Sequence, residues 1–449
     1  MLKLITLKSI GYIFECVFLL ILAGCTMEHP LDHSVTQDIS KVPQNTLAFL
    51  PPNASQPIAP RTAQKLAQNY INKFFAPWET PFIWQSPNFI KRESLAVTRS
   101  MARHPGWNQY QNLNTSYWAT QIARNANLAS YPNFKRRAIT IHATNLRLLP
   151  TNMRSFGGLC KKSNLYPIDN LQVSYLNSNL PLYVLHITRD RSWSLVITPN
   201  NCFGWVKTAD LTVVDEAFVE RWERSKFVVF INDNKHVLDG ITRISTMAPL
   251  VATTSSDYQV LAARKTDKGF ATTEIVNVSK DDAARWPLSI TPKNIAIQAN
   301  KFMGKHYGWG GIYGLRDCSE TMQALFAPFG IWLPRNSGAQ AHAGKYISLD
   351  DYDENDTEKQ IVKRGQPFLT LIWLPGHIML YIGEKHGKAY AFHNPWRLHI
   401  KNSRGAMDGR AVIGHTVITT LDLGKEYAHN NWIYLNLIKG ITLLAKPQY

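Results

Sequence analysis

The sequence predicts an α+β protein built from several domains, and three observations support this. Its 449 residues are enough for three or four domains of ordinary size. A stretch that begins near residue 61 has the periodicity of helices, and short apolar runs separated by turn residues follow it. The C-terminal third combines one amphipathic helix with apolar, β-favouring runs. We therefore expect a helical N-terminal domain, two small β domains and a C-terminal domain in which a helix packs on a sheet.

Residues 1–24 have the pattern of a secretory signal peptide. Two lysines precede an apolar run over residues 17–22, which is too short for a comfortable membrane span. The run ends in Leu22-Ala23-Gly24-Cys25, which resembles a bacterial lipobox, and this implies acylation of Cys25 as the first mature residue. We therefore expect a protein of the bacterial cell envelope that is anchored to the membrane by its N-terminal lipid. The alternative is an ordinary cleaved signal with a chance cysteine.

The residue after the lipobox bears on the choice of membrane. Thr26 is not the aspartate that favours retention in the inner membrane, so we expect the periplasmic face of the outer membrane. Residues 25–60 then read as an extended, poorly ordered tether, because polar residues separate repeated prolines. These prolines are Pro43, Pro51, Pro52, Pro57 and Pro60.

Residues 61–151 have the pattern of a helical domain. Apolar residues at helical spacing mark one face of a first helix that ends near Pro77, and a second helix is expected over residues 117–124. The face is formed by Ala63, Leu66, Ala67, Tyr70, Ile71 and Phe74. We interpret the aromatic residues of this region as core and interface packing and not as a binding site.

Two successive β domains are predicted at residues 152–215 and 216–290. The first contains apolar runs at 182–187, 193–198 and 203–207, and the second contains similar runs at 227–231, 250–252 and 258–263. The turn at residues 189–192 has a counterpart at 264–269. Both domains look like SH3-like barrels, whose sheet edges are suited to peptide binding. The alternative role is packing against the C-terminal domain.

The most informative segment is Arg316-Asp317-Cys318-Ser319, because it places a cysteine at the start of a helix. The apolar residues that follow have helical spacing, and Gly330 ends the helix. Asp317 and Glu320 have the spacing of a capping box, which makes Cys318 the first helical residue. Unpaired N–H groups and the helix dipole at that position favour a thiolate, so we expect a nucleophile. The alternative is an inert buried cysteine.

Two histidines follow on predicted strands and could serve that nucleophile. Apolar runs at 370–374 and 378–382 flank a Pro-Gly turn, and His377 begins the second run. A further run at 388–392 leads to His393. The expected parts are a nucleophile, a base and a polar residue that orients the base.

The register of the second hairpin decides whether the two histidines meet. A three-residue turn over 385–387 would pair Glu384 with Lys388 and place His393 opposite Met379, on the same face as His377. A two-residue turn would place the histidines on opposite faces. A contact between the two histidines therefore requires the three-residue turn, and the sequence leaves both turns open.

The C-terminal third resembles the NlpC/P60 family of cysteine peptidases. The resemblance is carried by Tyr307-Gly308-Trp309-Gly310-Gly311, by Asp317-Cys318-Ser319, by Leu333-Pro334-Arg335-Asn336-Ser337 and by residues 376–383. It implies a papain-like domain over residues 291–449 that cleaves peptidoglycan stem peptides. It also implies Cys318 as nucleophile, His377 as general base and His393 as the third polar residue.

The whole chain resembles, more weakly, a subfamily with an N-terminal stabilising domain and two bacterial SH3-like domains. Its members are γ-D-glutamyl-L-diamino acid endopeptidases that read a free N-terminal L-alanine. By resemblance, the substrate pocket is lined by Asp317, Tyr307, Trp309, Ser319 and Ser337. Asp317 would pair with the substrate amine. Asn336 stands where close relatives are expected to have aspartate, which removes one negative charge near this pocket.

The remaining cysteines and the charge complete the expectations. Cys160 and Cys202 lie in the first β domain and form a disulfide or remain two unpaired structural cysteines. Neither a zinc-ligand spacing nor a phosphate-binding glycine loop occurs, so we expect no metal and no cofactor. The net charge of +17 suggests an anionic neighbour such as a cell wall. Its basic residues are dispersed, which argues against nucleic acid. The expected partners are peptidoglycan stem peptides or released muropeptides.

Two other functions remain open on the sequence. One is a wall-binding lipoprotein in which the peptidase fold is only a scaffold, and intact Cys318, His377 and His393 argue against it. The other is an amidase or acyltransferase on the same fold, and two upstream β domains favour a peptide substrate instead. The sequence does not distinguish meso-diaminopimelate from lysine as the diamino acid.

Overall fold

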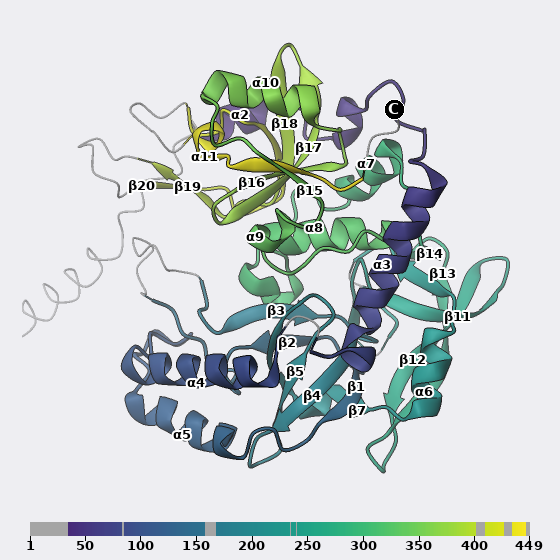
Figure 1. The fold of residues 1–449 in the computed structure, drawn as a ribbon, viewed down its shortest axis with the longest axis vertical. Helices are drawn as coiled ribbons and strands as arrows, with labels where there is room; N and C mark the ends of the chain where they lie inside the picture. Colours follow the sequence, from purple (N-terminus) through teal and green to yellow (C-terminus); the bar gives the residue numbers. More distant parts are fainter. Residues whose placement is uncertain are drawn as a thin grey trace, which may run out of the picture.

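The computed structural model describes residues 35–82, 85–157, 168–233, 235–238, 240–400, 409–425 and 433–445. The predicted signal peptide, the lipidation residue Cys25 and the possible disulfide partner Cys160 lie outside these ranges. Within them, no helix combines the length and the apolar character that crossing a membrane requires. Figure 1 shows helix α8 near the middle of the molecule, between a sheet of the C-terminal domain and a sheet of the first β module.

The N-terminal part consists of helices and short 3-10 turns. They are α2 (Val35–Lys41), η1 (Thr46–Phe49), α3 (Pro60–Glu79), α4 (Pro87–Arg103), α5 (Ser116–Ala126) and η2 (Leu128–Ser130). The two predicted helices correspond to α3 and α5. Side chains of Ser86 and Thr115 cap α4 and α5 by accepting hydrogen bonds from first-turn N–H groups. α3 extends two residues past Pro77, and Trp78 donates a hydrogen bond from Nε1 to the Ala138 carbonyl at 2.8 Å.

The prediction of a poorly ordered tether is wrong for residues 38–58, which pack on the C-terminal domain. Phe49 is buried in the core of that domain, and Thr46 donates a hydrogen bond to the Ala296 carbonyl at 2.7 Å. The Asp38 carboxylate accepts hydrogen bonds from the backbone N–H and the hydroxyl of Thr420, both at 3.0 Å. The proline content suggested a linker, but a few apolar and polar side chains between the prolines are enough to dock the segment.

The first β module begins earlier than predicted, because residues 136–147 form two of its strands. The strands are β1 (Arg136–Thr140), β2 (Thr144–Arg147), β3 (Gln172–Leu176), β4 (Pro181–Ile187), β5 (Trp193–Ile197), β6 (Phe203–Lys207) and β7 (Leu211–Val213), with η3 (Thr208–Asp210) before the last. They form one sheet in the order β3-β2-β6-β5-β4-β1-β7. The sheet is open, so a closed barrel is not confirmed.

The second β module is also an open sheet and not a closed barrel. It contains α6 (Glu216–Glu223), β8 (Phe227–Phe230), β9 (Lys235–His236), β10 (Ile241–Thr242), β11 (Met247–Thr253), β12 (Asp257–Lys265), β13 (Ala271–Ser279) and β14 (Ala283–Arg285). Five strands pair in the order β13-β12-β11-β8-β14, and β9 pairs with β10 separately. Its resemblance to an SH3 domain stays a prediction.

The C-terminal domain packs helices against an antiparallel sheet of six strands. Its elements are α7 (Pro292–Asn300), η4 (Trp309–Gly314), α8 (Cys318–Phe326), η5 (Ala327–Phe329), α9 (Ser337–Gln340), β15 (Lys345–Ser348), α10 (Glu354–Arg364), β16 (Thr370–Leu374), β17 (His377–Lys385), β18 (Lys388–His393), β19 (Arg397–Ile400), β20 (Gly409–Val412), β21 (Val417–Thr420), α11 (Tyr434–Leu437) and β22 (Gly440–Leu443). The sheet order is β15-β22-β16-β17-β18-β21, and β19 pairs with β20.

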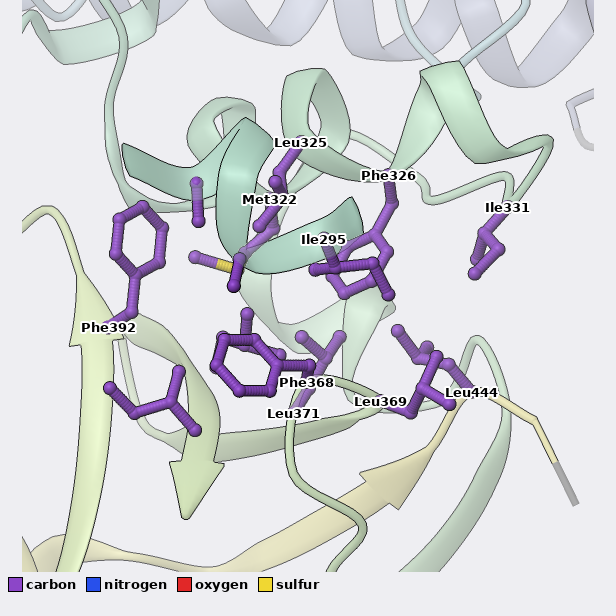
Figure 2. Close-up of a cluster of buried hydrophobic side chains, with 14 of the residues drawn as sticks. Ile295, Met322, Leu325, Phe326, Ile331, Phe368, Leu369, Leu371, Phe392 and Leu444 are labelled. Carbon is purple, nitrogen blue, oxygen red and sulfur yellow. The ribbon is translucent and has the colours of Figure 1, made fainter. Parts of the chain in front are cut away.

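The core of this domain fixes the position of α8. Met322, Leu325 and Phe326 on the helix are fully buried against sheet residues that include Leu371 and Phe392 (Figure 2). Burying a side chain of this size contributes about 1.5–3 kcal/mol. Helix α8 also packs directly on β17, the strand that begins with His377. The predicted arrangement of a helix carrying the cysteine on a sheet carrying the histidines is therefore confirmed.

Candidate active site

Cys318 is the first residue of α8, as the capping pattern predicted. The Asp317 side chain accepts a hydrogen bond from the Glu320 N–H at 2.9 Å, which is the N-cap half of a capping box. The reciprocal half does not form, because the Glu320 carboxylate instead accepts a hydrogen bond from Arg243 at 2.7 Å. The N–H of Cys318, at the first position of α8, has no partner within the helix and can bind an oxyanion.

The hairpin of β17 and β18 brings the two histidines together by a different route from the one predicted. The turn has two residues, His386 and Gly387, and Lys385 pairs with Lys388. Both turn residues have positive φ angles of 53° and 77°, as in the tight turns that join twisted strands. The three-residue turn that the expected contact required does not form.

A β-bulge corrects the register before the strands reach the histidines. The pairing shifts between Tyr381 and Gly383, and beyond it Leu380 lies opposite Phe392, one residue before His393. His377 and His393 consequently lie on the same face, with Nε2 of His377 2.8 Å from Nδ1 of His393. The predicted contact between the histidines forms although the three-residue turn does not.

The hydrogen bonds of this pair extend to a residue that sequence reasoning missed. Nε2 of His393 lies 3.0 Å from the hydroxyl of Thr419 on β21. If His377 donates from Nε2 to His393, then His393 donates from Nε2 to Thr419, and Nδ1 of His377 is left to accept a proton. Thr419 has no spacing relation to Cys318 that a sequence pattern could reveal.

The thiol of Cys318 lies beside the start of β17. The backbone N–H groups of Ile378 and Ser319 act on its sulfur as hydrogen-bond donors, and Ile378 directly follows His377. Cys318 is 7% exposed and His377 is 8% exposed. Cys318 and His377 are therefore held in a nearly dry environment.

Burial determines where the proton rests before substrate binds. Burial, aided by the Asp317 carboxylate, raises the pKa of Cys318 to about 12, despite the two N–H donors. Burial likewise lowers the pKa of His377 to about 3. Both shifts favour a neutral thiol beside a neutral imidazole. Removal of the thiol from water thus opposes the thiolate that the helix N-terminus favours.

Asp317 is paired inside the protein by a residue from the 333–337 motif. Arg335 donates hydrogen bonds to Asp317 Oδ2 at 2.6 Å and Oδ1 at 3.1 Å. Further donors to the carboxylate are the Gly310 N–H at 3.0 Å and the Ser319 hydroxyl at 3.0 Å. Burial raises the pKa of Asp317, but Arg335 and these donors outweigh it and hold the pKa below its usual range. Asp317 is thus a neutralised charge beside Cys318.

The glycines of the 307–311 motif let a loop fit between α8 and the first β module. A Cβ on Gly310, which has φ of 61°, would lie 2.6 Å from the Gln172 side chain and 2.9 Å from its carbonyl oxygen. A Cβ on Gly311 would lie 2.5 Å from Glu320 Oε2. The loop presents Trp309, 38% exposed, and Tyr313, 72% exposed, at the surface. Both exposed rings belong to the segment that directly precedes α8.

Two tyrosines flank Cys318, one predicted and one not. The phenol groups of Tyr307 and Tyr434 are both near Cys318, and burial raises the pKa of each. The ring centroid of Tyr434 lies 5.5 Å from that of His377 and 5.7 Å from that of His393. Tyr434 therefore covers the histidine pair. It lies 57 residues beyond His377 in the sequence, too far for any local pattern to connect them.

Ser319 and Ser337, the remaining predicted pocket residues, lie at the starts of α8 and α9. The hydroxyl of Ser319 accepts a hydrogen bond from Arg335 at 2.8 Å. Ser337 is the first residue of α9 and is half-buried. Asn336 is exposed and caps α9 through a 2.7 Å hydrogen bond from the Ala339 N–H to its Oδ1. In the described ranges, no cluster of three or more His, Cys, Asp or Glu residues could hold a metal ion.

A cavity of about 110 Å³ lies at the junction of the domains, behind α8, and Cys318 does not line it. Its walls come from the two β modules, α3 and the back of α8, and include Tyr70, Asn177, Arg243 and Gln323. Cys202 has no disulfide partner in the parts of the chain that are described, and Cys160 is not among them. The thiol of Cys202 lies near Arg335, and burial raises its pKa to about 11.

Comparison with known protein families agrees with this geometry. Residues 304–408 match the NlpC/P60 family. The C-terminal domain is an NlpC/P60 domain. Residues 14–131 match the N-terminal NLPC_P60 stabilising domain, and residues 156–207 match the SH3 domain of SH3b1 type. The chain thus joins an NlpC/P60 domain to a stabilising domain and one SH3b domain. The stabilising-domain match includes the docked segment that the sequence predicted as a tether.

Individual relatives are also similar to the chain. The gamma-D-glutamyl-L-lysine dipeptidyl-peptidase of Bacillus subtilis (strain 168) is 37% identical over 94 residues, which are 21% of this chain and 30% of that protein. The chain therefore matches less than a third of this relative's length. A solved NlpC/P60 endopeptidase from Photobacterium damselae subsp. piscicida is 26% identical with a TM-score of 0.80, covering 90% of this chain and 97% of its own. An NlpC/P60 family protein from Bacillus cereus ATCC 10987 is 16% identical, with a TM-score of 0.47, over 69% of this chain and 100% of its own.

Proposed function

We propose that the protein is a cysteine peptidase that cleaves peptidoglycan stem peptides as a γ-D-glutamyl-L-diamino acid endopeptidase. One observation carries the proposal: His377, His393 and Thr419 are linked in series and buried, and the strand that begins with His377 lies beside Cys318 at the N-terminus of a helix. The NlpC/P60 match supports the reaction class. The activity named for the Bacillus subtilis relative supports the choice of a γ-D-glutamyl bond.

The reaction begins from the neutral pair that burial favours. Nδ1 of His377 takes the thiol proton as the Cys318 sulfur attacks the γ-glutamyl carbonyl carbon. The Cys318 N–H stabilises the resulting oxyanion. Protonated His377 then gives its proton to the leaving amine of the diamino acid, and a thioester remains. Water, deprotonated by His377, attacks the thioester, releases the γ-carboxyl group and restores the thiol. His393 and Thr419 hold His377 in the required tautomer.

Recognition of the substrate's N-terminus is expected to differ from that of the subfamily the chain resembles. A free amine would need a carboxylate, and Asp317 is already paired with Arg335 while Asn336 is neutral. We infer that a free L-alanine amine is not strictly required, so the enzyme would accept stem peptides still attached to the wall. We further propose a lipid anchor at Cys25 that holds the enzyme on the periplasmic face of the bacterial outer membrane. The net charge of +17 fits work beside an anionic wall.

Mass spectrometry of defined peptides tests the proposed reaction. The substrate is L-Ala-γ-D-Glu-meso-diaminopimelate, incubated with soluble residues 26–449, and Cys318→Ala is the matched control. Release of L-Ala-γ-D-Glu by the wild type alone supports the proposal. Comparable cleavage of the N-acetylated substrate supports work on attached peptides, whereas loss of cleavage on acetylation shows that the amine is read. A lysine-containing peptide in parallel identifies the preferred diamino acid.

A second candidate function is wall binding without catalysis. The SH3b match and the basic charge favour it. If no peptide is cleaved but isolated peptidoglycan sediments the protein equally with and without Cys318→Ala, the binding function replaces the peptidase.

A further inference from the structure

In the second β module, residues 231–233 and 240–246 contain two side chains that contact the start of the nucleophile's helix and a residue just before it. Asp233 forms a two-pronged ion pair with Arg316, with both N–O distances 2.7 Å. Arg243 donates a hydrogen bond to Glu320 at 2.7 Å. Arg316 precedes Cys318 by two residues and Glu320 follows it by two. The two ion pairs therefore bracket the nucleophile on both sides.

Both ion pairs are buried, and each makes further contacts. The Arg243 side chain is 3% exposed, also donates to the Leu315 carbonyl at 3.0 Å, and lies over the Tyr175 ring at 4.9 Å. Asp233 accepts a further hydrogen bond from the Ile244 N–H at 2.9 Å. Burial raises the pKa of Asp233, but Arg316 outweighs it and holds the pKa at about 2. Charge-assisted hydrogen bonds of this length have strict geometry.

Such pairs resist displacement, because breaking one deprives a buried charge of its hydrogen-bonded partner. The residues on both sides of Cys318 can therefore adopt few arrangements while the second β module is docked. Catalysis by positioned groups is sensitive to small errors, and a displacement of about 1 Å can cost on the order of a hundredfold in rate. A module that fixes both flanks of the nucleophile is thus placed to control turnover.

We propose that the second β module positions the nucleophile, with Asp233 and Arg243 acting through Arg316 and Glu320. Neither residue touches the reacting atoms, so both are positioning residues. The module's contribution to turnover is the arrangement of the residues on both sides of Cys318 and not the binding of a ligand. For turnover the proposal rests on the proposed peptidase function, whereas for the reactivity of the thiol it stands alone.

The test compares matched variants in the soluble mature chain, residues 26–449. Arg243→Met removes the pair with Glu320, and Asp233→Asn removes the pair with Arg316 at nearly constant shape. Arg243→Lys keeps the charge. The control is Arg264→Met, which removes an ion pair of 2.6 Å with Glu274 inside the same module, on its β12–β13 hairpin. Thermal unfolding of each variant checks that it is folded at the assay temperature.

We expect Arg243→Met and Asp233→Asn to lower kcat about tenfold or more while KM changes less than about threefold. Arg243→Lys should recover most of the lost kcat, and Arg264→Met should match the wild type. Folded Arg243→Met and Asp233→Asn variants with wild-type kcat would overturn the proposal, as would an equal loss in Arg264→Met.

Alkylation of Cys318 by iodoacetamide separates this proposal from the proposed function, because it needs no substrate. Loosening of the residues beside Cys318 exposes the buried thiol, so the rate at fixed pH should rise about fivefold or more in Arg243→Met and stay unchanged in Arg264→Met. If the wild type cleaves no peptide but the alkylation rates differ in this way, the peptidase proposal fails and the positioning role stands. Equal alkylation rates in all folded variants contradict the positioning role.

Discussion

At the scale of single residues, burial favours a neutral Cys318 thiol beside a neutral His377 imidazole over a thiolate–imidazolium pair. Burial raises the pKa of Cys318 to about 12 and lowers that of His377 to about 3. The thiolate is the species that iodoacetamide alkylates, so its fraction should grow about tenfold per pH unit between pH 7 and pH 9. Peptide mass spectrometry of Cys318 measures the rate. A rate that is flat between pH 6 and pH 8 would indicate a resting thiolate–imidazolium pair instead.

Tyr434 offers a second prediction at this scale, because its ring covers both histidines. Tyr434→Phe keeps the ring and should retain kcat/KM within about threefold, whereas Tyr434→Ala admits water and should lower it about tenfold or more. Relief of burial also raises the pKa of His377 toward 6.5, so the acid limb of the pH–rate profile should move to higher pH in Tyr434→Ala. An unmoved acid limb in a folded Tyr434→Ala variant would limit the ring to a packing role.

The sequence predicted residue roles where the signals are local. Asp317 as N-cap and Cys318 as the first helical residue follow from spacing within one turn, and both are confirmed. Thr419 and Tyr434 come from distant segments and could not be found this way. The expected thiolate stays a prediction, because a helix start indicates a favourable dipole but does not reveal the burial that opposes it.

At the scale of elements, the loop before α8 depends on its glycines. Gly310→Ala should place a methyl group against Gln172 with a φ that L-residues rarely adopt, lowering stability by about 2 kcal/mol and reducing kcat/KM. Gly338→Ala is the matched control, since only Asn336 Oδ1 lies near its new Cβ, at 3.7 Å. Thermal unfolding and peptide cleavage measure both effects. Equal behaviour of the two variants would show that the loop tolerates a side chain.

The β17–β18 hairpin shows why an element can be predicted when its register cannot. Its strands follow from apolar runs, but a two-residue turn and a bulge between Tyr381 and Gly383 replace the three-residue turn. The bulge offsets the shorter turn, so the strand register at the histidines is the one that brings them together. A bulge depends on packing across two faces of the sheet, which no local pattern encodes.

At the scale of the whole molecule, one segment that its proline content marks as a linker in fact packs on another domain. Residues 38–58 dock on the C-terminal domain, where Phe49 and Val42 are buried. A chain that begins at residue 60 should therefore lose several degrees of Tm relative to one that begins at residue 35, because each buried side chain contributes about 1.5–3 kcal/mol. Equal melting of the two chains in differential scanning calorimetry would mean that the docked segment adds nothing.

The division into a helical part, two β modules and a C-terminal helix-on-sheet domain was predictable from periodicity, whereas its details were not. Strands β1 and β2 were assigned to the helical domain, and two closed barrels were expected where both sheets are open. The contacts of Asp233 with Arg316 and of Arg243 with Glu320 join positions more than 70 residues apart. Such pairings depend on how domains dock, which one sequence alone does not specify.

The central claim is that Cys318 forms a covalent thioester with the γ-glutamyl group. Rapid-quench mass spectrometry of soluble residues 26–449, mixed with L-Ala-γ-D-Glu-meso-diaminopimelate and stopped in acid, tests it most directly. The account predicts a transient adduct of L-Ala-γ-D-Glu on the peptide that contains Cys318, absent from Cys318→Ala. Cleavage that persists in Cys318→Ala, or an adduct on another residue, would contradict it.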